Sequence, residues 1–408
     1  MTDLTTLLTN VRPWGGSAVD LELRGGVIAA IHPSLGEVVR GEGVAVVDGG
    51  GRIALPAFTD AHVHLDSTRI GLPFRPHTAE PGPLWNLIAN DRAHWREAEE
   101  SVSDRATTTL GRAIAHGMTR ARSYAQVDAD CGLERLDGVL AAREHHRDRA
   151  DVQVVAFPQA GLLLEPGVPD LLDQALRSGA EVVGGIDPCG LDGDPIRHLD
   201  LVFDLAERHD VPIDIHLHEP GELGAWTMTK IVERVRAHQA RGRLTIAHAF
   251  ALADLPGPRL APLLESFAEW DVAITTVAPA RGTLPIPELT EWGIRIGLGQ
   301  DGQRDYWSPY GTTDMLDRTW QFAFTRGLRR DELIEHSVAI ATVGGASVID
   351  PTARRLAGTT DRPGLEVEDP AEIVLVAGDT VSAAVMDRAG GRTVVHRGRV
   401  VADASELR

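Results

Sequence analysis

The feature that most constrains the fold is an alternation of short apolar runs with longer amphipathic stretches between about Ala57 and Pro351. Short apolar runs separated by helix-length stretches indicate βα units around a parallel sheet. Eight such runs occur, at residues 58–64, 119–124, 152–157, 181–186, 213–218, 244–248, 272–277 and 294–299. Helices are predicted between them, for example at 133–147, 199–209 and 226–241. This order predicts an α/β fold with a (β/α)8 barrel over residues 57–351.

The two ends of the chain carry a different pattern, in which short β-rich runs are broken by glycines. Strands are expected at 19–23, 27–31 and 44–47 near the start of the chain, and at 372–376, 381–386 and 393–401 near its end. Glycine pairs and triplets between such runs are typical of tight turns. We therefore expect residues 1–56 and 352–408 to form one small β-sandwich from both chain ends.

Histidine and carboxylate side chains follow several of the eight predicted barrel strands. His62 and His64 close the first run, and alternate residues of a strand point to the same face. In a (β/α)8 barrel the functional groups lie at the carboxyl ends of the strands. The other polar residues at such ends are Gln159 after the third run, His216 and Glu219 at the fifth, His248 at the sixth and Asp301 after the eighth.

Three imidazoles and one carboxylate from these strand ends suit a divalent metal ion. We predict His62, His64, His216 and Asp301 as ligands of one Zn²⁺ or Fe²⁺, with room left for a water molecule. Such an ion lowers the pKa of its bound water from 15.7 to about 7, so hydroxide becomes available for hydrolysis at neutral pH. Asp301 has a second oxygen that can accept the proton of the attacking water.

Three further residues at the strand ends are candidates for contact with a substrate. Glu219 lies three residues after His216, a position from which a carboxyl group can act as general acid and base. His248 suits a polarising or proton-passing role, although a metal ligand is an alternative. Gln159 offers donor and acceptor atoms that complement the amide-like edge of a nitrogen heterocycle.

Several ordered motifs resemble the amidohydrolase superfamily, in particular enzymes of the cytosine deaminase type, over nearly the whole chain. The resemblance implies a one-metal barrel with an accessory β-sandwich, and it places Gln159, Glu219 and Trp307 at substrate-contacting positions. It also implies attack of hydroxide on a ring carbon, with Glu219 shuttling protons and ammonia leaving. The matching motifs are Asp60-Ala-His62-Val-His64-Leu-Asp66, Val154-Val-Ala-Phe-Pro-Gln159-Ala-Gly, Ala180-Glu-Val-Val-Gly-Gly, Ile213-Asp-Ile-His216-Leu-His-Glu219, Ala247-His248 and Asp301-Gly-Gln-Arg-Asp305-Tyr-Trp307-Ser-Pro-Tyr-Gly311.

The chain also departs from the cytosine deaminase pattern at three places. Gly302 follows Asp301, where cytosine deaminases usually carry an aspartate that holds the substrate amino group. The segment 184–194 lacks an expected histidine, and His218 stands where an acidic residue is expected. These changes keep the reaction class but alter the pocket, and relatives with such changes include hydrolases of triazine amines. The roles of His218, Asp66 and Cys189 stay open.

The predicted activity is metal-dependent hydrolytic deamination of an amino-substituted nitrogen heterocycle, such as a pyrimidine, purine, pterin or triazine. Alternatives are a cyclic amidase, an N-alkylamine hydrolase of the triazine type, or a binding protein without catalytic activity. The last alternative is disfavoured because the expected ligands and Glu219 are all present.

Charge and composition narrow the choice of partners and of compartment. The 59 acidic residues outnumber the 40 basic ones, which disfavours nucleic acid and anionic membranes and favours a small neutral or cationic substrate. Two cysteines are too few for a disulfide framework, and no segment has the features of a secretory signal or the roughly 18 apolar residues of a membrane span. We expect a cytoplasmic protein, and a homo-oligomer is one of the open alternatives for its assembly.

Overall fold

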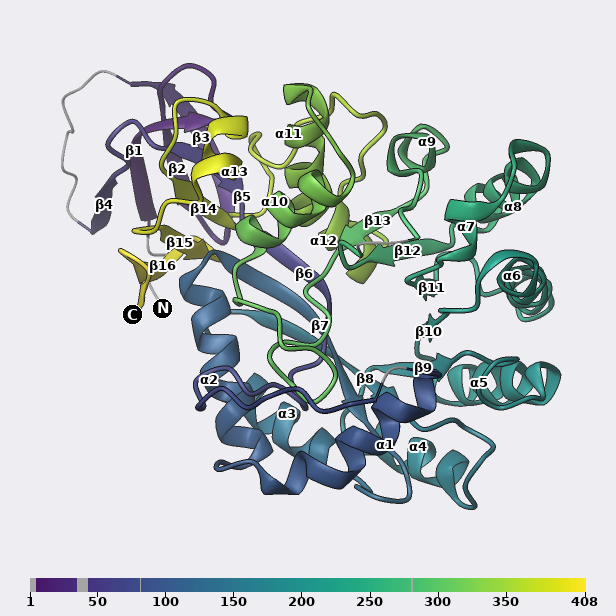
Figure 1. Cartoon of the computed structure of the whole chain (residues 1–408). Coiled ribbons are helices and arrows are strands. Elements are labelled where there is room, and N and C mark those ends of the chain that lie inside the picture. Colours follow the sequence, from purple (N-terminus) through teal and green to yellow (C-terminus); the bar gives the residue numbers. More distant parts are fainter. Residues whose placement is uncertain (1–4, 35–42, 81, 280–281) are drawn as a thin grey trace.

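A computed structural model describes residues 5–34, 43–80, 82–279 and 282–408 of the chain. Figure 1 shows a barrel with helices around it and, at one side, a sheet in which the purple and yellow ends of the chain lie together. Residues 1–4 and 35–42, which belong to the predicted terminal unit, lie outside the described residues.

The barrel consists of eight parallel strands that neighbour one another in chain order. Its last strand is joined to its first, because Val63 and Asp301 form a parallel bridge and the Asp301 amide donates to the His62 carbonyl at 2.8 Å. The predicted (β/α)8 barrel is therefore confirmed. The strands are β6 (Phe58–Val63), β7 (Met118–Gln126), β8 (Asp151–Phe157), β9 (Val182–Ile186), β10 (Ile213–His216), β11 (Leu244–Ala247), β12 (Ala273–Thr276) and β13 (Ile296–Leu298).

Helices surround these strands and bury one apolar face against them. α5 (Pro195–His209) illustrates the local rules, since the Asp194 side chain caps its first turn and Pro195 occupies its first position. Leu199, Val202 and Phe203 repeat at helical spacing and are buried. The remaining helices are α1 (Leu84–His94), η1 (Trp95–Glu97), α2 (Val102–Ala115), α3 (Glu134–His145), α4 (Val168–Arg177), α6 (Gly221–Ala237), α7 (Ala251–Asp254), α8 (Gly257–Trp270), α9 (Ile286–Glu291), α10 (Met315–Thr325), α11 (Asp331–Ala339), the π-helix η2 (Ile340–Gly344), α12 (Gly345–Ile349) and α13 (Val381–Asp387).

Strands from both chain ends join in one sheet beside the barrel. The central contact is between β5 (Ile53–Pro56) and β14 (Ile373–Val376), which pair antiparallel and join strands from the two ends of the chain. Alternating side chains of this sheet form a separate apolar core around Leu21, Leu23 and Leu375. The other strands are β1 (Thr5–Pro13), β2 (Val19–Arg24), β3 (Val27–Pro33), β4 (Val44–Asp48), β15 (Thr393–His396), β16 (Arg399–Asp403) and β17 (Glu406–Leu407).

The strand predicted at 381–386 is wrong, because this segment forms helix α13. The Thr380 hydroxyl accepts a hydrogen bond from the Ala383 amide and so caps the helix. The buried residues are Val381, Ser382, Ala384 and Val385, and their spacing is that of a helix face and not of a strand. The capping threonine and the spacing were both visible in the sequence.

One helical run meets the length and composition of a membrane span, contrary to the expectation of none. It covers Asp331–Ile349, and 72% of its most apolar window is buried inside the structure. The run packs against β6 and β13, and Gly344 allows this because a Cβ atom there would lie 2.4 Å from the Ile296 carbonyl oxygen. It is a buried helix of the barrel wall.

Candidate active site

Four side chains from three strand ends converge at the carboxyl end of the barrel. Asp301 Oδ1 lies 3.5 Å from His62 Nε2 and 3.4 Å from His64 Nε2. His216 Nε2 lies 3.4 Å from His64 Nε2. We call these four residues, His62, His64, His216 and Asp301, the His/Asp cluster. The structure brings together all four residues that the sequence predicts as metal ligands.

The separations within the His/Asp cluster fit a divalent metal ion. Ligand atoms at 2.0–2.1 Å from a tetrahedral zinc ion stand about 3.4 Å from each other, which is close to the distances above. His62 Nε2, the ring nitrogen that faces the cluster, is buried and has no hydrogen-bond partner among the described residues. The other nitrogen of His62 lies 3.3 Å from the Thr275 hydroxyl, which orients the ring as an outer partner of a metal ligand does.

Burial and mutual charge set the electrostatics of this cluster. Burial lowers the pKa of His62 and holds the pKa of His216 well below its usual range, so both imidazoles are neutral. Burial alone would raise the pKa of Asp301, but the His62 ring at 3.5 Å and the other nearby imidazoles hold it well below the usual value. Neutral imidazoles and an ionised carboxylate are the forms that bind metal.

Three residues at the strand ends adopt left-handed backbone conformations that non-glycine residues rarely adopt. The φ angles are 33° for Asp187, 66° for His248 and 64° for Asp301. Such conformations cost of the order of 1–3 kcal/mol each and gather where function requires a particular side-chain direction.

His248 stands beside the cluster, on the strand end after β11. Its ring centroid lies 4.8 Å from that of His62 and 5.0 Å from that of His216. The residue is buried, and neither Nδ1 nor Nε2 has a hydrogen-bond partner among the described residues. His248 with His62 and Asp301 forms a second possible ligand triad, so the predicted alternative between ligand and proton-passing group persists.

A cavity of about 530 Å³ opens over the His/Asp cluster. Gln159 and Trp307, the predicted substrate-contacting residues, both line it, and so do His218, His248 and Asp301. The Gln159 side-chain amide makes no hydrogen bond to any described residue and is free for a ligand. Apolar and aromatic side chains complete the wall, from α1, from the loops after β11 and β12, and from α10. They are Leu84, Leu87, Phe250, Val277, Trp320 and Phe324.

Glu219 is buried behind the cavity and does not line it. Its Oε1 accepts hydrogen bonds from the Cys189 amide at 2.7 Å and the Gly190 amide at 2.9 Å. Its Oε2 accepts a short hydrogen bond from the Thr227 hydroxyl. The carboxylate therefore ties the loop after β9 to α6.

His218 lines the cavity and is held by a carboxylate. Asp187 Oδ2 lies 2.7 Å from His218 Nδ1, and Asp187 Oδ1 accepts the His218 amide at 2.7 Å. Burial would lower the pKa of His218, but the hydrogen bond and charge of Asp187 raise it above the usual value. The sequence signal was the alternation of His216 and His218 along one strand, which left the role of His218 open.

The departure at Gly302 has a steric explanation. A Cβ atom at position 302 would lie 2.3 Å from Asp305 Oδ2, so Asp305 occupies the space of a side chain there. Asp305 is fixed by the Ser67 hydroxyl at 3.0 Å and by the Trp307 and Ser308 amides at 2.8 Å. Burial raises the pKa of Asp305 to about 6.

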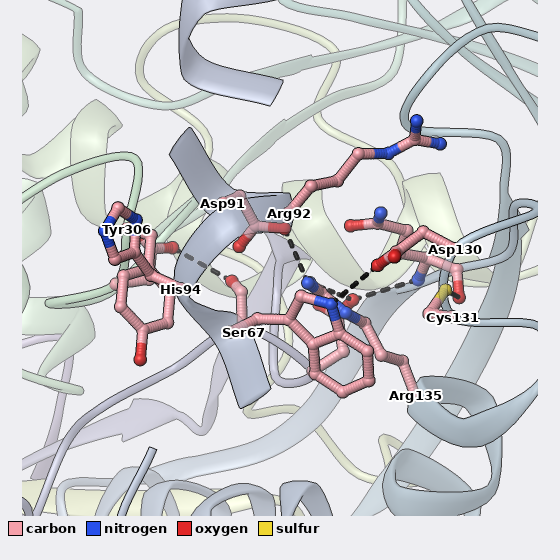
Figure 2. Close-up of polar contacts among 12 residues, drawn as sticks. Ser67, Asp91, Arg92, His94, Asp130, Cys131, Arg135 and Tyr306 are labelled. Carbon is pink, nitrogen blue, oxygen red and sulfur yellow. Dashed lines mark hydrogen bonds and ion pairs between the residues drawn. The ribbon is translucent and has the colours of Figure 1, made fainter. Parts of the chain in front are cut away.

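A buried ionic network connects the cover of the cavity to the strand that carries His64. Arg135 donates to Asp91 of α1 at 2.5 Å (Figure 2). It also lies 3.6 Å from Asp66, two residues after His64. Asp66 in turn accepts the Gln126 amide at 2.9 Å. Arg135 also stacks on the Trp95 ring at 4.6 Å. Sequence reasoning missed this arginine, because nothing in its helical context distinguishes it from exposed arginines.

A parallel barrel that carries a His/Asp cluster at its strand ends, at the base of a cavity, defines a metal-dependent barrel hydrolase. The chain belongs to the amidohydrolase family, whose sequence model matches residues 75–402. It is thus a hydrolase acting on carbon–nitrogen bonds other than peptide bonds, and its resemblance to the cytosine deaminase type is confirmed.

Three relatives illustrate this family membership. The chain is 28% identical over 393 residues to the N-isopropylammelide isopropyl amidohydrolase of Pseudomonas sp. (strain ADP), covering 94% of each protein. A crystal structure of N-isopropylammelide isopropylaminohydrolase from Burkholderia multivorans ATCC 17616 has a TM-score of 0.90 at 35% identity, over 99% of this chain and 100% of that one. The 5-methylcytosine deaminase of Klebsiella pneumoniae, liganded with 5-fluorocytosine, has a TM-score of 0.82 at 24% identity, over 97% of each chain, and shares the fold.

Proposed function

We propose that this protein is a metal-dependent hydrolase that removes an alkyl-substituted amine from a ring carbon of a nitrogen heterocycle. The observation that carries the proposal is the composition of the 530 Å³ cavity, which joins the His/Asp cluster to an apolar wall. Ligand cavities of this kind combine many apolar contacts with a few polar groups that fix orientation. The 35% identity to N-isopropylammelide isopropylaminohydrolase over 99% of the chain supports the same choice.

In this proposal His62, His64, His216 and Asp301 hold one Zn²⁺ or Fe²⁺ ion. When bound, such an ion supplies Lewis acidity that makes water a nucleophile at neutral pH. Asp301 offers its second carboxylate oxygen to accept a proton, and His248 is placed to pass one. Gln159 and Trp307 contact the ring from the cavity wall.

The catalytic role implied for Glu219 by the family resemblance stays a prediction. Both of its oxygens are engaged by the Cys189 and Gly190 amides and by Thr227. A proton-transfer role would require the carboxylate to give up these bonds and turn into the cavity.

Release of ammonia from an unsubstituted amine is the second candidate function. The observation that favours it is the free amide of Gln159, which can pair with the amide-like edge of a ring whichever amine leaves. Alkylamine release and ammonia release differ in what contacts the apolar wall. Only an alkyl substituent on the amine gains from burial against Trp320 and Phe324.

The test uses purified protein loaded with Zn²⁺ or Fe²⁺ and mass spectrometry of the products. Hydrolysis of N-isopropylammelide replaces the exocyclic C–N bond by a C–O bond, and gives cyanuric acid and isopropylamine. We expect isopropylamine release to exceed ammonia release from cytosine or from an amino-substituted triazine. Ring opening would indicate a cyclic amidase instead. No amine from any of these compounds, at one metal ion per chain, would contradict the proposal.

We further propose that the protein works in the cytoplasm on a small-molecule substrate. Both cysteines, Cys131 and Cys189, are free thiols, as is usual in a reducing compartment.

A further inference from the structure

We propose that Arg318 makes the cavity selective for heterocycles that carry negative charge, with its guanidinium hydrogen-bonding an ionised ring oxygen beside the His/Asp cluster. This inference rests on the proposed function, because it assumes that a nitrogen heterocycle lies in the cavity. It names a charge class for the substrate and a residue that recognises it. The net charge of the chain, −19, favours the opposite charge at long range, whereas Arg318 acts at the site itself.

The first support is the place of Arg318 in the cavity. Arg318 lies in the first turn of α10, is 8% exposed and lines the cavity together with Gln300 and Asp301. Its Nη1 donates to the Val277 carbonyl at 2.9 Å, and its Nε donates to the Gln300 side-chain oxygen at 3.2 Å. Its Nη2 donates a short hydrogen bond to the Gln300 carbonyl. The guanidinium is therefore held between the ends of β12 and β13, against the residue that precedes Asp301.

The second support is that Arg318 lacks a paired carboxylate. Its three hydrogen bonds go to neutral oxygens, and no carboxylate of a described residue lies within ion-pair distance of it. Arg135, another arginine of the cavity wall, is paired with Asp91 and Asp66 instead. Burial lowers the pKa of Arg318, but a guanidinium stays charged in proteins. A buried cation without a partner is costly, and an anionic ligand removes that cost.

The third support is the direction of two carboxylates whose charges act on Arg318, Asp301 and Asp60. Asp301 belongs to the His/Asp cluster, where its Oδ1 lies 3.5 Å from His62 Nε2. Asp60 Oδ1 accepts the Gln300 amide at 3.0 Å. Both carboxylates are thus engaged elsewhere, and neither neutralises Arg318 by direct contact.

The ligand chemistry follows from the remaining donors of Arg318. A guanidinium has five N–H groups, and the hydrogen bonds above use one on each nitrogen, so one N–H remains on each Nη atom. Such a fork binds anionic oxygens more strongly than neutral ones. Hydroxylated triazines and pyrimidines have acidic ring amides, and loss of the ring proton spreads the negative charge over their oxygens. Oxygen-bearing heterocycles of this kind are the charge class that we infer.

The test compares the binding of two six-membered rings to zinc-loaded protein by calorimetry at neutral pH. Barbiturate is an anion under these conditions, and uracil is neutral. Arg318→Met removes the charge, and Arg318→Gln removes it while keeping an amide donor for the neighbouring carbonyls. Arg326→Met is the control, since Arg326 lies at the other end of α10 and does not line the cavity. Metal content, melting temperature and isopropylamine release from N-isopropylammelide are measured for every protein.

We expect the wild-type protein and Arg326→Met to bind barbiturate at least about tenfold more tightly than uracil. In Arg318→Met and Arg318→Gln, barbiturate binding should weaken about tenfold to a hundredfold, the effect of losing a hydrogen bond between charged groups, and uracil binding by less than about threefold. Metal content should not change.

Equal losses of both rings in a folded Arg318 variant would overturn the inference, because an arginine that only supports the wall affects both ligands alike. Persistence of the barbiturate preference in such a variant would also overturn it. If neither variant folds, the wild-type protein still tests the inference, since equal affinity for barbiturate and uracil would contradict it.

The outcomes separate this inference from the proposed function. A barbiturate preference that depends on Arg318, without amine release from N-isopropylammelide, would retain the inference and contradict the function. Amine release without a barbiturate preference would retain the function and overturn the inference. Absence of binding and of amine release in the wild-type protein would contradict both.

Discussion

The His/Asp cluster and the wall of the cavity above it lie side by side but are held by different parts of the chain. The cluster comes from β6, β10 and the bridge after β13, where neighbouring backbones fix each side chain. The wall comes from loops and from helices α1 and α10, and it includes Trp307, Trp320 and Phe324. The barrel therefore determines where chemistry occurs, whereas the loops and outer helices determine what is bound there.

The largest expected effect falls on the His/Asp cluster. His216→Ala removes a buried ligand position and should reduce both metal affinity and activity by more than about a hundredfold. Loss of a residue that only supports a metal ligand costs about 10–100-fold. Elemental analysis and amine release measure this. His32→Ala, on a half-exposed residue of β3, is the control, and full metal content in His216→Ala would contradict the ligand assignment.

The next largest effect is on stability, and it concerns the buried ionic network of Arg135, Asp91 and Asp66. Arg135→Met leaves the buried carboxylates of Asp91 and Asp66 without their shared cation. Breaking such a pair by removing one partner costs about 3–5 kcal/mol of unfolding free energy. Urea denaturation measures this, and Arg147→Met, at an exposed arginine, should change it by less than about 0.5 kcal/mol. Equal stability of the two variants would show that the network is not required.

A substitution in the cavity wall should weaken substrate binding and leave the metal content of the protein unchanged. Phe324→Ala removes an aromatic ring from the apolar wall and should raise KM for N-isopropylammelide about tenfold while kcat changes little. The control is Phe74→Ala, an equally exposed phenylalanine that does not line the cavity. A fall in kcat at constant KM would mean that Phe324 acts in the transition state and not as a binding surface.

The smallest expected effect is on the pH dependence of stability, and it comes from His146, which lies outside both the His/Asp cluster and the cavity wall. His146 is buried between α3 and α2, where its Nε2 lies 3.1 Å from the Thr107 carbonyl, and burial lowers its pKa to about 4. The unfolded chain takes up a proton at this histidine near pH 6.5, whereas the folded chain does so near pH 4. Its neutral form therefore supports folding above pH 6.5, and stability declines as the pH falls toward 4.

Protonation of His146 in the unfolded chain should lower the free energy of unfolding by about 1 kcal/mol at pH 5.5 relative to pH 7.5. His146→Gln should lose correspondingly less stability between these two pH values, as urea denaturation at each pH measures. The exposed neighbour in His145→Gln should leave the wild-type dependence intact. An identical pH dependence in His146→Gln and wild type would contradict the assignment.

The same comparison explains what could be predicted from the sequence. The barrel and the His/Asp cluster were predictable because alternation along a strand fixes side-chain direction, as for His62 and His64. The cavity wall was harder, because Glu219 turns toward backbone amides of another loop and His218 toward the cavity, and no periodicity encodes that difference. Arg135 was missed because burial of an arginine depends on its distant partners Asp91 and Asp66.

The central claim is that one metal ion on the His/Asp cluster serves amine hydrolysis in the cavity above it. The most direct measurement is isopropylamine release from N-isopropylammelide during titration of metal-free protein with Zn²⁺ or Fe²⁺. The account predicts that activity rises with added metal and reaches its plateau at one ion per chain, and that His216→Ala shows no such rise. Amine release that is independent of metal, or a plateau of bound metal without amine release, would contradict it.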